Sequence, residues 1–440
     1  MPRTLPHHHP RPSLRGLSRR AFLQRSLATS GVIATGPLLW SCGNSMGVGG
    51  TVLSPSLTLL GPLQAPDENG IRLPEGFTSR VIAESGLPIV SDLVGGVLGP
   101  LLGYEWHTFP DGGATFPAPD GGWVYVSNSE SVPGGVGAIR FNAAGERVDA
   151  YRILGGTLIN CAGGPTPWGT WLSCEEIPTG RVHECLPFGN ALQARARPAL
   201  GIFDHEAVAV DPDRKQLFLT EDSGDATFYR FVPSAEDWPE GAERPALEQG
   251  VLQVMVVPGV SDSRDIPLDS PPLAVEWIDA LNPGQPQARN RRPEATVFAG
   301  SEGIWYVDGL VYFTCKSGNR VWVYDAVAQT VELIYAADLH GGGEAPLRGV
   351  DNCVVFDGTR DLLVAEDGGD MRITAIGPDG VVAPILQIVG QDDSEITGPA
   401  FSPDGERLYF SSQRGGRASG GERVGRGRRE KGEGVCLEED

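Results

Sequence analysis

The sequence predicts an all-β protein with the architecture of a β-propeller of about six blades. The 440 residues include 60 glycines and 36 prolines, so turns are frequent and long helices are disfavoured. From about residue 76 to about residue 413, a unit recurs that consists of an alternating apolar segment, a turn often of the Asp-Gly type, and a second alternating segment. The unit returns every 45 to 55 residues or so, which favours propeller blades over a twisted sandwich.

The first 41 residues are predicted to be an export signal. Residues 18–23, Ser-Arg-Arg-Ala-Phe-Leu, form a twin-arginine signature, and a modestly apolar run from Ser26 to Trp40 follows. The run is too short for a membrane span. We expect the twin-arginine export machinery to carry the protein to the periplasm or cell envelope. Lipid attachment at Cys42 stays open, because the preceding residues match an attachment box only loosely.

Three further regions follow along the chain. Residues 42–75 are rich in Gly, Ser, Pro and Leu and are predicted to be a linker. Residues 76–413 are the predicted propeller, in which we expect the functional site to lie. Residues 414–440 hold seven basic and six acidic residues in a low-complexity stretch, and we expect them to be disordered, with a free Cys436. The sequence therefore leaves the closure of the last blade without a predicted strand.

The propeller units share an acidic or polar residue at the end of their second segment. The clearest units lie at 121–130, 206–222, 302–316, 351–367 and 398–411. If equivalent positions face the axis, one mouth of the channel gathers Glu130, Glu175, Glu221 and Glu366, and the residues that open units, Glu206, Glu302 and Asp351, approach the same end. Carboxylates this close repel one another unless cations neutralise them. We therefore predict a multi-metal site at the axis; the alternative is that the acids only solvate strand ends.

Overall acidity agrees with cation binding and argues against nucleic acid as a partner. The formal net charge is −21, and residues 1–41 contribute six arginines and no acid, so the remaining chain stands at −27. Such a chain repels nucleic acid and anionic membranes. Clustered carboxylates suit Ca²⁺, although acidity also serves solubility alone.

One stretch, residues 160–176, combines a rigid loop with a short strand. It reads Asn-Cys-Ala-Gly-Gly-Pro-Thr-Pro-Trp-Gly-Thr-Trp-Leu-Ser-Cys-Glu-Glu, and its alternating end brings Cys174, Glu175 and Glu176 to one place. A thiol beside two carboxylates is a metal-ligand set; the alternative is a buried structural cysteine followed by two solvated acids. The sequence has no CxxC pair, which excludes a zinc ribbon. Export permits disulfides, and the pairings Cys161–Cys185 and Cys315–Cys353 stay open.

This stretch, together with residues 205–212, 220–222 and 302–306, resembles the PhoX-type alkaline phosphatases over about residues 70–413. The resemblance implies a monomeric, twin-arginine-exported propeller that hydrolyses small phosphate monoesters with Fe³⁺ and Ca²⁺ at its axis. It implies an iron-binding thiolate at Cys174 and iron-binding carboxylates at Glu206 and Glu302. The remaining calcium or bridging ligands would be Glu175, Glu176, Glu221 and Glu366. No catalytic residue is assigned.

The sequence departs from this family pattern at Gly300. The pattern places an arginine two residues before the glutamate that opens Glu-Gly-Ile-Trp-Tyr, where its planar fork clamps phosphate. Loss of such a contact removes on the order of a few kcal/mol of transition-state binding. Nearby candidates for its replacement are Arg291, Arg292 and Arg348. The alternative function is a catalytically lapsed, or differently active, propeller that binds calcium and iron.

Overall fold

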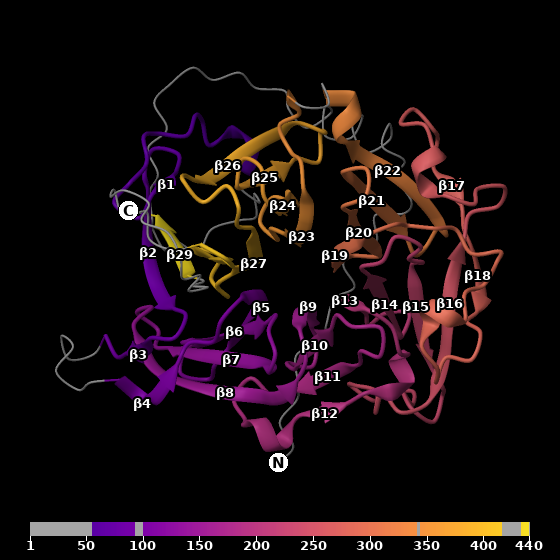
Figure 1. Ribbon diagram of the computed structural model, residues 1–440, viewed down its shortest axis with the longest axis horizontal. Helices are drawn as coiled ribbons and strands as arrows, with labels where there is room; N and C mark the ends of the chain where they lie inside the picture. Colours follow the sequence, from indigo (N-terminus) through magenta and orange to yellow (C-terminus); the bar gives the residue numbers. More distant parts are fainter. Residues whose placement is uncertain (1–54, 93–99, 341–343, 416–432, 440) are drawn as a thin grey trace, which may run out of the picture.

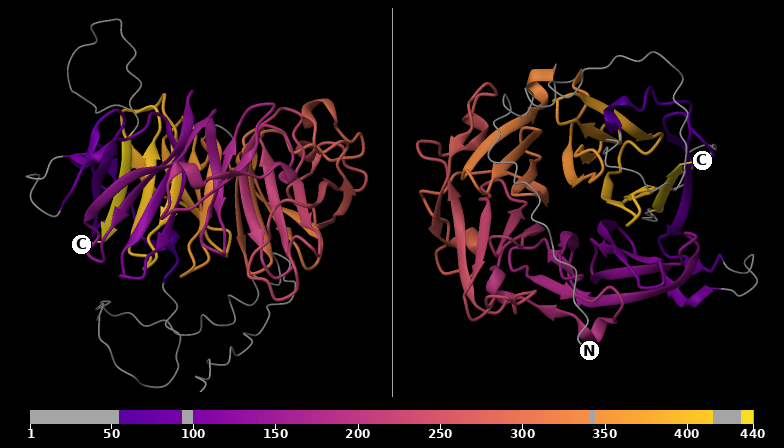
Figure 2. Two further views of the ribbon diagram at one scale, coloured as in Figure 1. Left: turned by 90° about the horizontal axis from the view of Figure 1, so that it is seen from below. Right: turned by 180° about the vertical axis from the view of Figure 1, so that it is seen from behind.

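The computed structural model describes residues 55–92, 100–340, 344–415 and 433–439. Six antiparallel sheets of four or five strands stand around a central axis, as Figure 1 shows. The predicted six-bladed β-propeller is therefore confirmed. Seen from the side in Figure 2, the strands of neighbouring blades run side by side through a disc-like body. No helix in the described parts of the chain is long and apolar enough to span a membrane.

Each blade begins at the axis and proceeds outward. The innermost strands are β5 (Pro110–Pro117), β9 (Asn160–Pro165), β13 (His205–Asp211), β19 (Ser301–Val307), β23 (Val350–Val355) and β27 (Ile396–Phe401). The second strands are β6 (Trp123–Ser129), β10 (Trp171–Glu175), β14 (Gln216–Glu221), β20 (Leu310–Cys315), β24 (Leu362–Glu366) and β28 (Arg407–Ser412). The third strands are β7 (Gly134–Phe141), β11 (Val182–Cys185), β15 (Tyr229–Pro233), β21 (Arg320–Asp325), β25 (Arg372–Ile376) and β29 (Glu433–Glu439).

The outer edges of the blades vary more than their inner strands. The outer strands are β8 (Arg147–Thr157), β12 (Arg195–Ala196), β16 (Gly250–Val256) with β18 (Glu276–Asp279), β22 (Thr330–Ala336) with β17 (Leu273–Ala274), β26 (Val382–Ile388) with β1 (Ile71–Arg72), and β2 (Phe77–Glu84). A separate hairpin consists of β3 (Pro88–Val90) and β4 (Pro100–Glu105). Short 3₁₀ turns are η1 (Leu57–Leu59), η2 (Ala191–Gln193), η3 (Pro198–Leu200), η4 (Ser263–Asp265), η5 (Gln287–Arg289) and η6 (Ala337–His340).

The last blade joins the two ends of the described chain. Strand β29 lies between β28 and β2, which comes from the N-terminal side, and pairs with both of them. The expectation of disorder throughout 414–440 is therefore wrong for residues 433–439. Their composition is unfavourable for a strand, but the two neighbouring strands supply the backbone partners, and Val435 and Cys436 are buried between blades. Strand β1 likewise joins the propeller from within the region expected to be linker.

The core lies between adjacent blades, where the alternating apolar side chains of neighbouring sheets interlock. Between the first and last blades, for example, Tyr125 stacks on Tyr409 with ring centroids 4.9 Å apart, and Trp123 donates a hydrogen bond to the Tyr409 hydroxyl at 3.0 Å. All six cysteines in the described residues are buried free thiols. Both disulfide pairings left open by the sequence are therefore absent. The export signal and Cys42 lie outside the described residues.

Candidate metal centre at the propeller axis

A β-bulge near the start of five innermost strands turns an acidic or thiol side chain toward the axis. In β5, β9, β13, β19 and β23, two consecutive residues lie opposite a single residue of the second strand. The first residues of these bulges are Asp111, Cys161, Glu206, Glu302 and Asp351. The second is glycine or alanine in four of the five bulges, which lets the inner strands approach closely: a Cβ on Gly112 would lie 2.5 Å from the Ala162 Cα. The bulge of β27 has Gly398 and Pro399 and carries no acid.

A second ring comes from the first residue after each second strand. Its members are Glu130, Glu176, Asp222, Lys316, Asp367 and Gln413. Five of them donate a backbone hydrogen bond to a residue just before the innermost strand of the same blade, at 2.7 to 3.0 Å: Glu130, Glu176, Lys316, Asp367 and Gln413. The repeated bond fixes this second ring at the same height in each of these blades.

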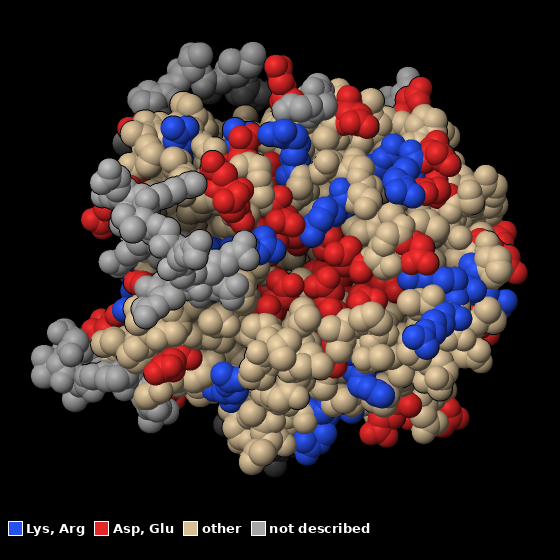
Figure 3. All heavy atoms as spheres, in the orientation of Figure 1, with Lys and Arg blue, Asp and Glu red and all other residues tan. Residues whose placement is uncertain are grey.

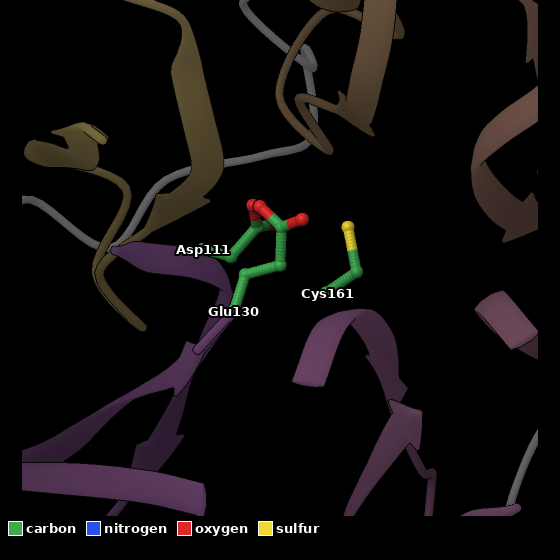
Figure 4. A group of neighbouring side chains, drawn as sticks. All are labelled: Asp111, Glu130 and Cys161. Atoms are coloured by element: carbon green, nitrogen blue, oxygen red, sulfur yellow. The ribbon is translucent and has the colours of Figure 1, made fainter. Parts of the chain in front are cut away.

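The two rings, together with Glu395 before β27, bring carboxylate and thiol groups close enough to share metal ions. Four groups have ligand atoms within 4.8 Å of one another: Asp111, Glu130 and Cys161; Cys161, Glu176 and Glu206; Glu206, Glu302 and Asp351; and Asp351, Asp367 and Glu395. Because neighbouring groups share a residue, they form one continuous arc around the axis. Figure 3 shows the acidic side chains gathered over the centre of this face, and Figure 4 shows the first group, with the Asp111 and Glu130 carboxylates directed toward each other and the thiol across from them.

Burial makes this arrangement costly without cations. Burial raises the pKa of Glu206, Glu302 and Asp111 well above the usual range of carboxyl groups, and the charges of neighbouring carboxylates raise it further. The Cys161 thiol donates to Glu206 Oε1 at 3.4 Å, while Glu206 Oε2 is buried with no hydrogen-bond partner. A buried, unpartnered carboxylate oxygen beside a thiol fits a metal ligand set, because bound cations would replace the missing protons and partners.

Two basic side chains and one amide lie among these acids. Lys316 Nζ is 3.1 Å from Glu302 Oε1, 3.5 Å from Asp351 Oδ2 and 3.2 Å from Asp367 Oδ2. Arg414 forms an ion pair with Glu395 at 2.8 Å. The Gln413 amide donates to Asp111 and to Glu130, each at 2.6 Å. The protein thus neutralises or caps part of the acidic arc with its own side chains.

The structure brings three of the seven predicted ligands to the axis: Glu176, Glu206 and Glu302. Three others, Glu175, Glu221 and Glu366, have a different and shared role. Each accepts a hydrogen bond from the backbone N–H six residues later, which holds the turn into the third strand of its blade. The recurrence seen in the sequence is therefore real, but it marks a structural position one residue before the second ring.

Cys174 does not face the axis. It lies opposite the bulge of β9, has no exposed surface, and packs in an apolar cluster with Leu172, Val182 and Leu219. The structure corrects the choice of cysteine: the axial thiol of the 160–176 stretch is Cys161, the first residue of the bulge, and the buried structural alternative applies to Cys174. The motif offered two cysteines, and only the bulge, which sequence periodicity does not reveal, distinguishes them.

Six further axial residues were not among the seven predicted ligands. Two of them, Glu130 and Asp351, were expected to approach the axis, whereas Cys161, Asp111, Asp367 and Glu395 were not predicted there. A usable signal existed for several of them. An acid or cysteine is followed by glycine or alanine in Asp111-Gly112, Cys161-Ala162, Glu206-Ala207 and Glu302-Gly303, each near the start of an innermost strand. Aligning these dipeptides indicates four of the five residues of the first ring; Asp351, which Asn352 follows, does not share the pattern.

A buried glutamate holds the loop of the 160–176 stretch in place. Glu184 of β11 accepts hydrogen bonds from Trp168 Nε1 at 2.9 Å and Thr170 Oγ1 at 2.8 Å, and Arg197 Nε donates to its other oxygen at 3.0 Å. Because the loop connects β9 to β10, these contacts fix the strand that carries Cys161.

Gly300 lies beside the second ring, where its carbonyl accepts the backbone N–H of Lys316 at 2.7 Å. A Cβ built on it would lie 3.4 Å from Asp222 Oδ1 and 3.1 Å from Ser317 Oγ, so a side chain here would begin at the mouth of the centre. The backbone is left-handed, with φ +58°, but Phe109 and Ile159 adopt nearly the same φ at the equivalent positions of their blades. A larger residue therefore fits the backbone at this position.

The three arginines considered as substitutes for the one missing at residue 300 have other partners. Arg291 bonds Glu221 at 2.7 Å and Asp225 at 2.9 Å, while Arg292 donates to the Asp279 carbonyl at 2.7 Å. Arg348 lies 3.5 Å from Asp370. Lys316 does lie beside the position of the missing arginine: its backbone N–H bonds the Gly300 carbonyl, and its ammonium contacts the acids of the arc.

The model of the family described as alkaline phosphatase PhoX matches residues 135–185 and 179–337, which include Cys161, Glu176, Glu206, Glu302 and Lys316. The resemblance to the PhoX-type alkaline phosphatases that the sequence predicted is confirmed over these residues. The structure of Pseudomonas fluorescens PhoX in complex with vanadate, described as a transition state analogue, has the same fold, with a TM-score of 0.67, 18% identity, and coverage of 86% of this chain and 97% of that one.

Other solved structures resemble this chain more distantly. The Xanthomonas campestris gluconolactonase XC5397 has a TM-score of 0.42 and 12% identity, over 88% of this chain and 99% of its own. A Bacteroides thetaiotaomicron protein of unknown function has a TM-score of 0.46 and 10% identity, over 82% and 76%. No curated protein matches by sequence. The PhoX family is metal-dependent, which agrees with the acidic groups at the axis.

Proposed function

We propose that this protein is a metal-dependent phosphatase that hydrolyses small phosphate monoesters with iron and calcium ions held at the propeller axis. The observation that carries the proposal is the arc of four overlapping ligand groups in a chain that resembles the PhoX family. Its support from a relative is the vanadate complex of the Pseudomonas fluorescens protein, because vanadate there is described as a transition state analogue.

The ligands divide by chemistry. Cys161 belongs to two neighbouring groups, one of which also contains Glu176 and Glu206. Because a thiolate is a soft ligand, these groups would hold iron rather than calcium. The groups around Asp351 offer only carboxylate oxygens, the ligands that Ca²⁺ prefers. Bound cations of this kind would neutralise the carboxylates and hold the oxygens of a phosphate group.

The chain itself contributes position and charge. The bulges orient the ligands, and the glycine and alanine that follow four of them bring the strands together so that the ligand groups overlap. Lys316 and Arg414, with 35% and 42% of their side chains exposed, are accessible to an anionic substrate that approaches this face. Positive groups at the border favour the approach of a phosphate to a centre that is otherwise acidic.

The cellular setting is part of the proposal. The twin-arginine signature in residues 1–41 supports export of a folded monomer to the periplasm or cell envelope, with lipid attachment at Cys42 as an open alternative. Export of the folded protein suits a chain that acquires its metals first. The acidity of the chain argues against nucleic acid as a partner.

A second function is favoured by one specific observation, the glycine at position 300. Without a planar, bidentate phosphate contact, the centre would bind metals but stabilise the transition state poorly. This alternative is a catalytically lapsed or differently active propeller that binds calcium and iron.

One experiment separates these functions. The protein lacking residues 1–41 is purified, its iron and calcium are measured by elemental analysis, and it is assayed with p-nitrophenyl phosphate before and after exhaustive chelation. We expect stoichiometric metal and hydrolysis that chelation abolishes. Metal without hydrolysis would support the alternative, and a protein without stoichiometric metal would contradict both.

A further inference from the structure

The second ring contains one residue of opposite charge. Five of its six positions hold carboxylates or an amide: Glu130, Glu176, Asp222, Asp367 and Gln413. The sixth, after β20, holds Lys316. Its backbone N–H bonds the Gly300 carbonyl, as those of Glu130, Glu176, Asp367 and Gln413 bond the equivalent carbonyls of their blades. The lysine is therefore presented to the axis by the same geometry that presents acids in the other blades.

The Lys316 ammonium joins two of the four ligand groups. It contacts Glu302 and Asp351, which belong to the third group, and Asp367, which with Asp351 belongs to the fourth. Three carboxylate oxygens at 3.1 to 3.5 Å from one ammonium nitrogen form a cation site that is already filled by a side chain. Glu302 and Asp351 are almost fully buried, so solvent does not compete strongly for these contacts.

A metal ion would otherwise suit this position. Three carboxylates from β19, β23 and the end of β24 converge there, and oxygen ligands of this kind bind Ca²⁺. An ammonium and a divalent ion cannot share the position, because like charges at such short range repel.

We propose that Lys316 is a resident cation of the centre, which takes the place of one Ca²⁺ ion between Glu302, Asp351 and Asp367. It follows that the wild-type chain binds one divalent ion fewer than its carboxylates would hold if residue 316 were neutral. The inference rests on the metal-binding part of the proposed function and not on hydrolysis.

The test counts calcium in metal-stripped protein. Wild type, Lys316→Gln, Lys316→Arg and Lys215→Gln are titrated with Ca²⁺ by isothermal calorimetry, and the bound ion is measured by elemental analysis after gel filtration. Lys215 is the matched control, because its ammonium lies in another blade, where it bonds the backbone carbonyls of Trp238 and Pro239 and lies over the Trp238 ring. We expect one additional equivalent of Ca²⁺ in Lys316→Gln, and the wild-type number in the other two variants.

Folding of the neutral variant is addressed by a second measurement. Without its internal cation, Lys316→Gln leaves three carboxylates facing one another, so its melting temperature should rise more steeply with Ca²⁺ than that of wild type. A second neutral variant, Lys316→Met, must behave in the same way. Equal calcium numbers in wild type and both neutral variants would overturn the inference while leaving the proposed function intact, whereas a wild-type protein that binds no metal would overturn both.

Discussion

The 160–176 stretch contains two cysteines, and replacing each of them separately gives the sharpest test of the centre. Cys161 Sγ lies 3.4 Å from Glu206 Oε1 and belongs to two of the four ligand groups. Cys174 is fully buried among apolar side chains and belongs to none. Replacing each with alanine therefore removes a proposed metal ligand in one case and a packing contact in the other.

We expect one variant to lose iron affinity and the other to lose folding stability. Changes to residues that only support ligands cost 10- to 100-fold in metal affinity, so Cys161→Ala should weaken iron binding by at least that factor, about 1.4 to 2.7 kcal/mol. Its packing loss is small, because the side chain faces the axis. Cys174→Ala should keep iron but lose about 1 to 2 kcal/mol of folding stability through the small cavity that it leaves.

The assay combines elemental analysis of both purified variants with urea unfolding of their metal-free forms. Wild type and a Cys161→Ser protein, which keeps the size of the side chain, serve as controls. The assignment of the axial thiol would be refuted by a Cys161→Ala protein that retained full iron and by a Cys174→Ala protein that lost it.

Three further predictions follow from the same contacts. Gly300→Arg should leave metal content unchanged and raise kcat/KM for p-nitrophenyl phosphate by 10-fold or more, since a charged phosphate contact is worth about 1.5 to 3 kcal/mol; an unchanged value would show that residue 300 does not face the phosphate. Burial raises the pKa of Glu184, but its hydrogen bonds outweigh burial and hold that pKa below the usual value, so its stabilising effect is present at neutral pH and lost as the pH falls below about 4.5. Glu184→Gln should accordingly cost about 3 kcal/mol in urea unfolding at pH 7 and less at pH 3.5, because it breaks the buried pair with Arg197; an equal loss at both values would contradict this. Burial and neighbouring acids raise the pKa of Glu176 to about 8, so the folded metal-free protein holds a proton that the unfolded chain lacks, and its stability should fall by up to about 1.4 kcal/mol per pH unit between pH 4.5 and 8; metal-loaded protein should not show this fall.

The fold was predictable because its information is local. Alternating strands, Asp-Gly turns and a regular spacing repeat in each blade, and each of these patterns can be recognised in a short window of sequence. The closing strand was not predictable in this way. Strand β29 is flanked by a partner from each end of the chain, and its stability comes from those partners rather than from its own composition.

The acidic character of the site was predictable from the sequence, but the exact residues that face the axis were not. The recurrence of acids at the ends of second strands correctly indicated an acidic axis, yet Glu175, Glu221 and Glu366 precede the axial position by one residue. In a strand a shift of one residue changes the face that a side chain occupies. At Glu175 and Glu176 both residues are glutamate, so only the backbone pairing of the blade, Asn160 with Glu175, separates the turn-holding residue from the axial one.

The similar blades present chemically different side chains on the two sides of the centre. Six structurally similar bulges present Asp111, Cys161, Glu206, Glu302, Asp351 and Gly398. The thiol therefore serves only the groups on one side of the axis, whereas Lys316 contacts acids on the side of Asp351 and Asp367. A soft donor at one end and an ammonium at the other make the ligand groups unequal, although the blades that supply them are built alike. We therefore expect the ions in this centre to differ in kind: iron beside Cys161, and calcium where only carboxylates are offered.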